Sequence, residues 1–173
     1  PNKPVFVKIP EFYYKIEKSG NIFRYYIADG PASGFSLHPG SGCYVARYEI
    51  SNNNVNGTNT FTSYSGNFIT TSTTRSGFRN TAKVTATGFQ LYDFAAWCAY
   101  DLLYLVEYAA FNSQEKIGPG IVNDTAAHKT GETDAMVYHT GRAHSGDNSA
   151  VQYRGIENPW GNVSEFIDGI NIQ

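Results

Sequence analysis

The sequence predicts a mixed α+β fold with one long helix, short antiparallel strands and extensive loops, and three observations support this prediction. Residues 5–27 alternate apolar and polar side chains around a Ser-Gly-Asn turn, a pattern typical of a β-hairpin. Residues 89–110 contain neither glycine nor proline, which favours a helix. Elsewhere, short apolar segments lie between stretches rich in Gly, Asn and Thr, which indicates short strands joined by loops.

Length and composition indicate a single globular domain. The 173 residues (19.1 kDa) are 41% hydrophobic and only 16% charged, which excludes a disordered, collagen-like or coiled-coil chain. The net charge is −2 and no basic patch stands out, so we expect no nucleic-acid partner. Charge runs from +4 over residues 1–100 to −6 over residues 101–173, so the second half is the better place for a cation.

The first half of the chain predicts a hairpin, a further strand and a long polar loop. Strands at 11–18 and 22–27 flank Gly20 and Asn21, which we expect to supply positive φ at the turn. Residues 42–50 predict another strand. Residues 51–76, rich in Asn, Thr and Ser, predict a long surface excursion, with strand fragments as the alternative. Within this tract, Tyr64 and Phe68 could contact a ligand.

Residues 88–110 predict a helix that is buried on most faces and capped by Thr87. Asp93 and two further acidic residues along it are expected to form a narrow solvated stripe. These acids and four tyrosines make membrane insertion unfavourable. Cys98 lies in this apolar run, which predicts a buried thiol, and Cys98 and Cys43 are too few for a disulfide scaffold.

The last third predicts loops followed by short strands. Residues 112–150 are rich in glycine-containing turns and leave no room for a helix of normal length. Strands are expected at 151–158 and 161–168, joined by a Pro159-Trp160 turn, and a second apolar alternation follows at 170–172.

A hard cation is one candidate for the segment 158–165. The side-chain oxygen of Asn158, the carbonyls near Gly161 and Val163, and the carboxylate of Glu165 could converge as the chain turns. Such a set suits the oxygen-only preference of Ca²⁺. The alternative is that the Asn and Glu side chains cap backbone groups at a tight turn while the neighbouring aromatic residues fill the core.

The motifs of common catalytic sites are missing from the sequence. It contains no Gly-x-Ser-x-Gly elbow, no His-Glu-x-x-His and no Gly-rich nucleotide-binding loop. The closest histidine pair, His139 and His144, lacks the spacing of zinc hydrolases, and all four histidines are expected to be scattered on the surface. We therefore assign no catalytic residue.

Residues 161–166, Gly-Asn-Val-Ser-Glu-Phe, resemble a known signature. It is the Gly-Asn-Val-Trp-Glu-Trp core of the C-type-lectin-like fold family that includes the formylglycine-generating, sulfatase-modifying enzymes. Ser164 and Phe166 replace its two tryptophans. Residues 88–93, 112–121 and 154–160 resemble a branch found in phage and prophage tail or receptor-binding proteins. Another branch serves as the variable ligand-binding protein of diversity-generating retroelements.

The resemblance covers residues 42–172 and implies a single C-type-lectin-like domain over 1–173. Residues 1–41 would form an N-terminal hairpin and loop, and 42–173 the core, whose carboxy-terminal end could be truncated. In the family, the residues that match Asn158, Gly161, Val163 and Glu165 hold a structural Ca²⁺. The reactive cysteine pair and the His-rich iron site of the family's enzymes have no counterpart in the sequence.

The expected function is a non-catalytic ligand-binding module on a virion tail or a bacterial cell surface. Its ligand would be a cell-surface glycan or protein, recognised by loops 51–76 and 122–150. The alternatives are a metal-dependent oxidase of the sulfatase-modifying superfamily and a structural domain for homo-oligomer or tail-fibre assembly. The candidate ligand-binding residues are Tyr64, Phe68, Tyr138, His139, Arg142 and Tyr153.

Overall fold

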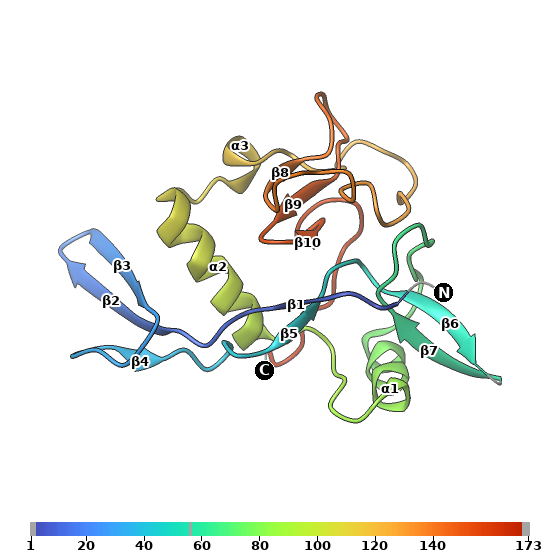
Figure 1. Cartoon of the computed structure of the whole chain (residues 1–173), viewed down its shortest axis with the longest axis horizontal. Coiled ribbons are helices and arrows are strands. Elements are labelled where there is room, and N and C mark those ends of the chain that lie inside the picture. Colours follow the sequence, from blue (N-terminus) through green and yellow to red (C-terminus); the bar gives the residue numbers. More distant parts are fainter. Residues whose placement is uncertain (1–2, 56, 171–173) are drawn as a thin grey trace. The chain divides into compact units, whose positions relative to one another are not determined.

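The computed structural model describes residues 3–55 and 57–170, and its fold is mixed α+β with several short antiparallel sheets and few helices (Figure 1). The chain separates into two compact units. The loop unit combines the chain up to Val7 with Val45–Leu91 and Asn112–Phe166. The hairpin unit combines Lys8–Tyr44, Tyr92–Phe111 and the chain from Ile167. The length of the chain predicted a single domain. Each of the two compact units is assembled from three separate segments of the chain.

The N-terminal hairpin of the hairpin unit forms as the sequence predicts. Strand β2 (Tyr13–Ser19) pairs antiparallel with β3 (Ile22–Ala28), and β4 (Ser36–Leu37) lies on the other side of β2. Because Ser19 pairs with Ile22, Gly20 and Asn21 form a two-residue turn. Gly20 has φ +61°, but Asn21 is not among the residues with positive φ, so the prediction for Asn21 is wrong. Positive φ at the first position alone is typical of a type II′ turn.

Helix α2 (Phe94–Tyr108) confirms the predicted helix but begins six residues later than expected. Asp93 caps it, since its Oδ1 accepts a hydrogen bond from the backbone N–H of Ala96 at 2.8 Å. The prediction that Thr87 is the cap and that Asp93 belongs to a solvated stripe is therefore wrong. The backbone next to Asp93 also forms a parallel bridge with Asp168. The helix buries Ala96, Ala99, Tyr100, Leu102, Leu103 and Tyr104 and exposes Phe94, Trp97 and Val106.

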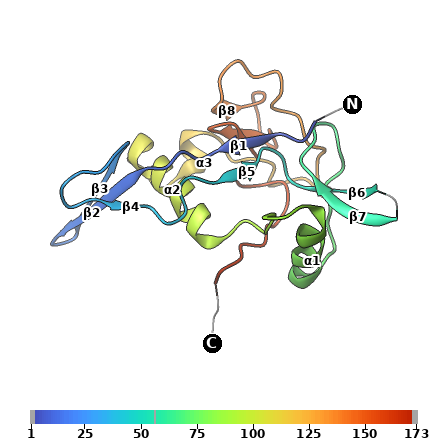
Figure 2. The ribbon, with the colours of Figure 1, turned by 60° about the horizontal axis from the view of Figure 1, so that its bottom comes forward.

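Residues 51–85 of the loop unit fold into a hairpin and a helix. Strands β6 (Ser51–Val55) and β7 (Thr58–Thr62) pair antiparallel, so strand fragments are correct for this part of the predicted excursion. Helix α1 (Arg75–Thr85), which the sequence did not predict, lies beside β7 in both views (Figures 1 and 2). The ring centroids of Phe61 and Phe78 lie 5.5 Å apart, and the ring centroid of Phe166 lies 5.9 Å from that of Phe78, both pairs being tilted.

The core of the loop unit lies at a small sheet with the strand order β10-β9-β8. Strands β9 (Val151–Tyr153) and β10 (Ile156–Glu157) join through Arg154 and Gly155, which both have positive φ, as in a type I′ turn. Strand β8 (Gly141–Arg142) pairs with β9. The predicted strand 151–158 is therefore a hairpin in itself. The predicted strand 161–168 is wrong, because residues 161–163 are bends, residues 164–167 are irregular, and only Asp168 forms a bridge.

The remaining elements are short. Strands β1 (Phe6–Lys8) and β5 (Tyr44–Ala46) form a two-stranded sheet, so the strand predicted over 42–50 is only three residues long. Helix α3 (Ser113–Lys116) is a single turn, as expected for the loop-rich tract. The alternation predicted at 170–172 falls largely outside the described residues. Among the described residues, no helix has the length and apolar character needed to cross a bilayer.

Candidate functional site: two fixed loops and a buried acidic cluster

Two loop segments of the loop unit, residues 64–68 and 129–142, are held together by Thr130, and we name them the recognition loops. The Thr130 hydroxyl donates to the carbonyl of Tyr64 at 2.6 Å. Its carbonyl accepts from Gly66 N at 2.7 Å, and its own N–H donates to the carbonyl of Asn67 at 3.0 Å. Three hydrogen bonds from one buried threonine fix the spacing of the two loops.

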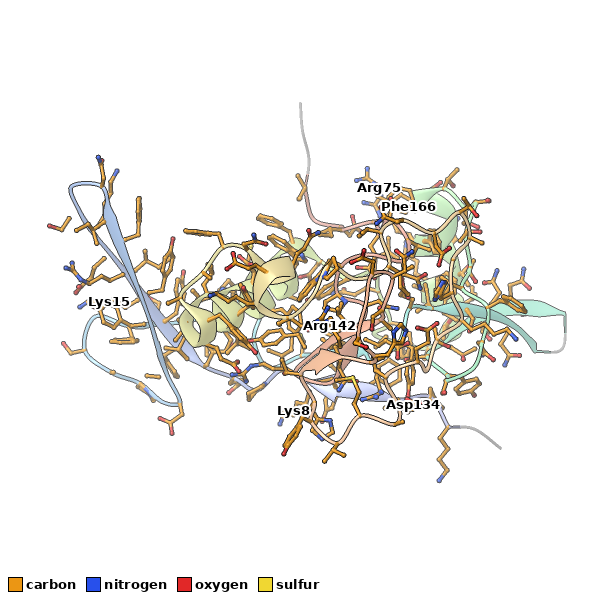
Figure 3. The ribbon with its side chains drawn as sticks, turned by 90° about the horizontal axis from the view of Figure 1, so that it is seen from above. Lys8, Lys15, Arg75, Asp134, Arg142 and Phe166 are labelled. Atoms are coloured by element: carbon orange, nitrogen blue, oxygen red, sulfur yellow. The ribbon has the colours of Figure 1, made fainter. Side chains whose placement is uncertain are left out.

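Asp134 is a second point at which the recognition loops are fixed (Figure 3). Its carboxylate accepts hydrogen bonds from the hydroxyls of Tyr48 and Ser65, and it forms an ion pair with Arg47 at 3.3 Å. Partial burial opposes ionisation of Asp134, but the Ser65 and Tyr48 hydrogen bonds and the Arg47 charge lower its pKa overall. An ionised Asp134 therefore connects both loops to the start of the segment that follows β5.

The end of the second loop is fixed to the β9–β10 turn. The carbonyl of His139 accepts from Gly155 N at 2.8 Å, and the hydroxyl of Thr140 accepts from Arg154 N at 3.1 Å. The side chain of Arg142, labelled in Figure 3, lies so close to Gly118 that a Cβ there would approach Arg142 Cδ to 2.3 Å. These contacts fix His139 through its backbone and Thr140 through its hydroxyl, and they place the Arg142 side chain against Gly118.

Four of the six candidate ligand-binding residues lie exposed on the recognition loops. Phe68 is 73% and Tyr138 79% exposed, and His139 and Arg142 are also exposed. Tyr64 is half-buried. Tyr153 lies on the central strand of its sheet and is fully buried, so its side chain is not available at the surface.

Sequence reasoning missed two features of this surface. Val137 is 85% exposed beside Tyr138, and an apolar residue next to an aromatic one in a Gly- and Thr-rich loop was the available signal. Lys129 places its ammonium 4.3 Å from the centre of the Phe68 ring, a cation–π contact that the sequence did not reveal. The exposed apolar groups of the loops are thus bordered by positive charge.

A buried acidic residue, Glu157, holds the second recognition loop in place through hydrogen bonds. Glu157 is 2% exposed, and its carboxylate accepts from Gly131 N at 2.7 Å, from Thr133 N at 2.8 Å and from the Thr133 hydroxyl at 2.6 Å. A carboxylate with three hydrogen-bond donors is well compensated for burial. Glu157 therefore fixes residues 131–133 to strand β10.

Glu49 is also buried, but it has fewer hydrogen-bond donors than Glu157 to offset the loss of water around its carboxyl group. It is 8% exposed, and its Oε2 accepts from the amides of Asn158 at 3.2 Å and Asn162 at 2.7 Å. Its Oε1 is buried and has no hydrogen-bond partner. Burial raises the pKa of Glu49 to about 8, the two amides oppose this shift, and the charges of Glu165 and Glu157 add to it. Sequence reasoning missed Glu49 because it lies more than 100 residues from both amides.

The candidate calcium ligands lie in one short curled segment of the loop unit. Asn158 and Gly161 adopt positive φ, at +47° and +83°, and the carbonyl of Gly161 accepts from Val163 N at 2.8 Å. The side-chain oxygen of Asn158 accepts from Val151 N at 3.2 Å, which is the backbone capping of the alternative interpretation. Glu165 is exposed as a residue, yet burial of its carboxyl group raises its pKa to about 7.

The histidines are less uniform than the sequence suggested. His139 and His144 are exposed, as predicted, but His38 is only 7% exposed. His128 lies between two carboxylates, Asp124 at 2.6 Å and Glu132 at 2.7 Å. Within the described part of the chain, no group of three or more His, Cys, Asp or Glu residues is arranged to hold a metal ion.

Both cysteines belong to the hairpin unit and are free and half-buried, so the prediction that Cys98 is buried holds only in part. Burial raises the pKa of each thiol, and the carboxylates of Asp93, for Cys43, and Asp101, for Cys98, add to the shift. A reactive cysteine needs the opposite shift, because the thiolate is the nucleophile.

Comparisons with protein-family models, with curated proteins and with solved structures find no match for this chain.

Proposed function

We propose that the protein is a non-catalytic ligand-binding module whose recognition loops bind a glycan or protein on a cell surface. One observation carries the proposal: Phe68, Val137 and Tyr138 are exposed on loops that Thr130 and Asp134 hold in place. Apolar side chains that cluster at a surface indicate an interaction site. Loops that are already ordered lose less conformational entropy when a ligand binds, which favours affinity.

The chemistry of the loops suits a ligand with both apolar faces and polar groups. The Tyr138 ring offers a flat apolar face and a hydroxyl, a combination common in binding surfaces. Arg142 offers a guanidinium that can bind a carboxylate or several hydroxyls, and His139 adds a further donor or acceptor. Sugars and protein surfaces both present such a mixture.

The proposal includes a C-type-lectin-like fold and a setting on a phage or prophage tail, or as a retroelement-diversified variable protein at a cell surface. Residues 161–166, which resemble the family signature, support it. The mixed α+β architecture with short sheets and long loops is compatible with it.

We further propose that Asn158, Gly161, Val163 and Glu165 hold a structural Ca²⁺. The donor set consists of oxygens alone, which fits this ion. A Glu165 carboxyl with a raised pKa and a buried, unpartnered Oε1 of Glu49 nearby would both be stabilised by a cation. Bound Ca²⁺ would supply charge compensation for these groups and fix the curl of the segment.

Thermal unfolding with Ca²⁺ and with a chelator tests the calcium site. We expect Ca²⁺ to raise the Tm of the wild-type chain, and Glu165→Gln to abolish that rise. Glu115→Gln, the same change at an exposed glutamate of the same unit, should keep it. A wild-type Tm that does not respond to Ca²⁺ would contradict the assignment.

Binding of the labelled protein to a panel of bacterial cells and glycans tests the recognition function. Selective binding by the wild-type chain is expected, and Tyr138→Ala should weaken it at least about tenfold, as for a central aromatic contact. Phe111→Ala removes an equally exposed ring from the hairpin unit and should leave binding unchanged. The proposal fails if nothing on the panel is bound, or if the two variants behave alike.

A further inference from the structure

His128 lies in a closed cluster of charges that the proposed function does not use. Its Nε2 is 2.6 Å from a carboxylate oxygen of Asp124, and its Nδ1 is 2.7 Å from a carboxylate oxygen of Glu132. The two acids stand four residues before and four residues after the ring. We name these three residues the His128 clamp.

The geometry of the clamp requires an additional proton. A neutral imidazole has one N–H, so its other nitrogen would direct a lone pair at a carboxylate oxygen less than 3 Å away. Both contacts are attractive only when both nitrogens carry hydrogen. Since carboxyl groups ordinarily lose their protons at lower pH than histidine, the proton belongs on the ring.

The backbone of His128 is joined to the segment that contains the candidate calcium ligands. Its N–H donates to the side-chain oxygen of Asn162 at 2.8 Å, and its carbonyl lies 3.4 Å from the Asn162 amide. Asn162 is neutral, and its amide also donates to the carboxyl group of Glu49. The charged groups that act on the imidazole are the carboxylates of Asp124 and Glu132.

The segments that contain the two acids of the clamp, here called its Asp124 arm and its Glu132 arm, differ in how firmly the rest of the loop unit holds them. Glu132 precedes Thr133, whose backbone N–H and hydroxyl are bound by the buried carboxylate of Glu157. Asp124 begins a stretch, 124–127, in which every residue is exposed. When the ring becomes neutral and one contact turns repulsive, the Asp124 arm is therefore the one that opens.

We propose that the His128 clamp is a pH-dependent latch: the protonated ring holds residues 124–128 in place next to Lys129 and Thr130 of the recognition loops, and the neutral ring releases them. Hydrogen bonds and charge from the two carboxylates raise the pKa of His128 against a smaller opposing effect of burial. The latch is thus closed at low pH and opens as pH rises through that raised pKa. Its importance for ligand presentation rests on the proposed function, but the latch itself acts without a ligand.

Proton linkage determines how strongly the opening equilibrium of the latch depends on pH. Between the pKa of the ring in the open state, about 6.5, and the higher pKa in the closed state, the opening equilibrium constant rises tenfold per pH unit. Outside this window it is constant. Amide hydrogen exchange of residues 124–128, corrected for its intrinsic pH dependence, should therefore lose protection tenfold per unit within the window and no further above it.

The test uses NMR on the labelled full chain between pH 5.5 and 9, without ligand. We expect the His128 ring to titrate above about pH 6.5, and Asp124→Asn and Glu132→Gln each to lower that midpoint and the protection of residues 124–128. Asp147→Asn, at another exposed aspartate of the loop unit, is the matched control and should change neither.

Two results would overturn the latch: a wild-type His128 midpoint at or below about 6.5, or protection of residues 124–128 that does not fall between about pH 6.5 and that midpoint. If Glu132→Gln fails to fold because it adjoins buried Thr133, the exposed Asp124→Asn gives the same test. Because no ligand is present, failure of the latch leaves the recognition function standing. Absence of binding on the cell and glycan panel leaves the latch standing.

Discussion

Replacing Glu49 by Gln should remove one contribution to the pH dependence of stability between pH 5 and 9, the contribution made by the Glu49 carboxyl group. Glu49 is buried, one carboxylate oxygen has no partner, and burial raises its pKa from 4.5 to about 8. Gln has nearly the shape of the protonated acid, and its carbonyl can accept both asparagine amides. It removes the charge without enlarging the side chain.

The magnitude follows from the pKa difference. A carboxyl group whose pKa is raised on folding binds its proton more tightly in the folded state, so stability falls as pH rises from the unfolded value towards the folded one. One pKa unit corresponds to about 1.4 kcal/mol. With the values 4.5 and about 8, the wild-type chain should lose roughly 4 kcal/mol relative to Glu49→Gln between pH 5 and pH 9.

Urea denaturation of both chains at pH 5, 7 and 9, in the presence of a chelator, measures this difference. Glu115→Gln provides the same chemical change at an exposed position of the same unit and should follow the wild-type pH profile. An equal difference in free energy of unfolding between wild type and Glu49→Gln at all three pH values would refute this prediction. Such a result would mean that Glu49 titrates alike in the folded and unfolded states.

Three further substitutions test the local structure by urea denaturation. Gly161→Ala should cost more than about 2 kcal/mol, since the residue has φ +83° and a Cβ would lie 2.8 Å from the backbone N of Ile121; a neutral effect would contradict this packing. Asp93→Ala should cost about 1 kcal/mol through loss of the α2 cap, and an unchanged midpoint would refute the cap. Glu157→Gln should cost about 2–4 kcal/mol, because it leaves a buried backbone N–H facing an amide instead of a carboxylate; full stability would show that these hydrogen bonds are dispensable.

The elements that could be predicted are those that form from local sequence patterns. The β2–β3 hairpin follows from alternation and from a glycine at the first turn position, where positive φ is needed. Helix α2 follows from its long apolar run, but its start does not, because Thr87 and Asp93 are both good capping residues. Only Asp93 caps it, at the residue whose backbone also bridges to Asp168.

Helix α1 was missed because its composition resembles that of a loop. It carries Ser, Thr, Asn and Gly, which favour turns, and few apolar residues. Its apolar side packs Phe78 against Phe61 of β7 and against Phe166, which is distant in sequence. Tertiary packing, which the local pattern does not contain, stabilises this helix.

The sequence identified candidate recognition residues by their residue type, but it did not reveal which of them are buried. Tyr138 and Tyr153 both stand in polar, Gly-containing surroundings, yet one is 79% exposed and the other fully buried. Tyr153 lies on β9, the central strand of its sheet, whereas Tyr138 lies in the loop that precedes β8. Strand order in a sheet of such short strands depends on contacts between segments, so a single sequence cannot separate the two tyrosines.

The pKa of Glu49 also provides a test of the proposed calcium site. The charge of Glu165 raises the pKa of Glu49, so the two carboxyl groups act on one another electrostatically. A cation held by Glu165 must act with the opposite sign and lower the pKa of Glu49. In saturating Ca²⁺, the stability that the wild-type chain loses relative to Glu49→Gln between pH 5 and 9 should therefore shrink, while Glu165→Gln keeps the same pH profile with and without the ion. A wild-type pH profile unaltered by Ca²⁺, measured in the same urea series, would place any bound ion away from this segment and leave Glu49 as a buried acid that the protein tolerates in its protonated form.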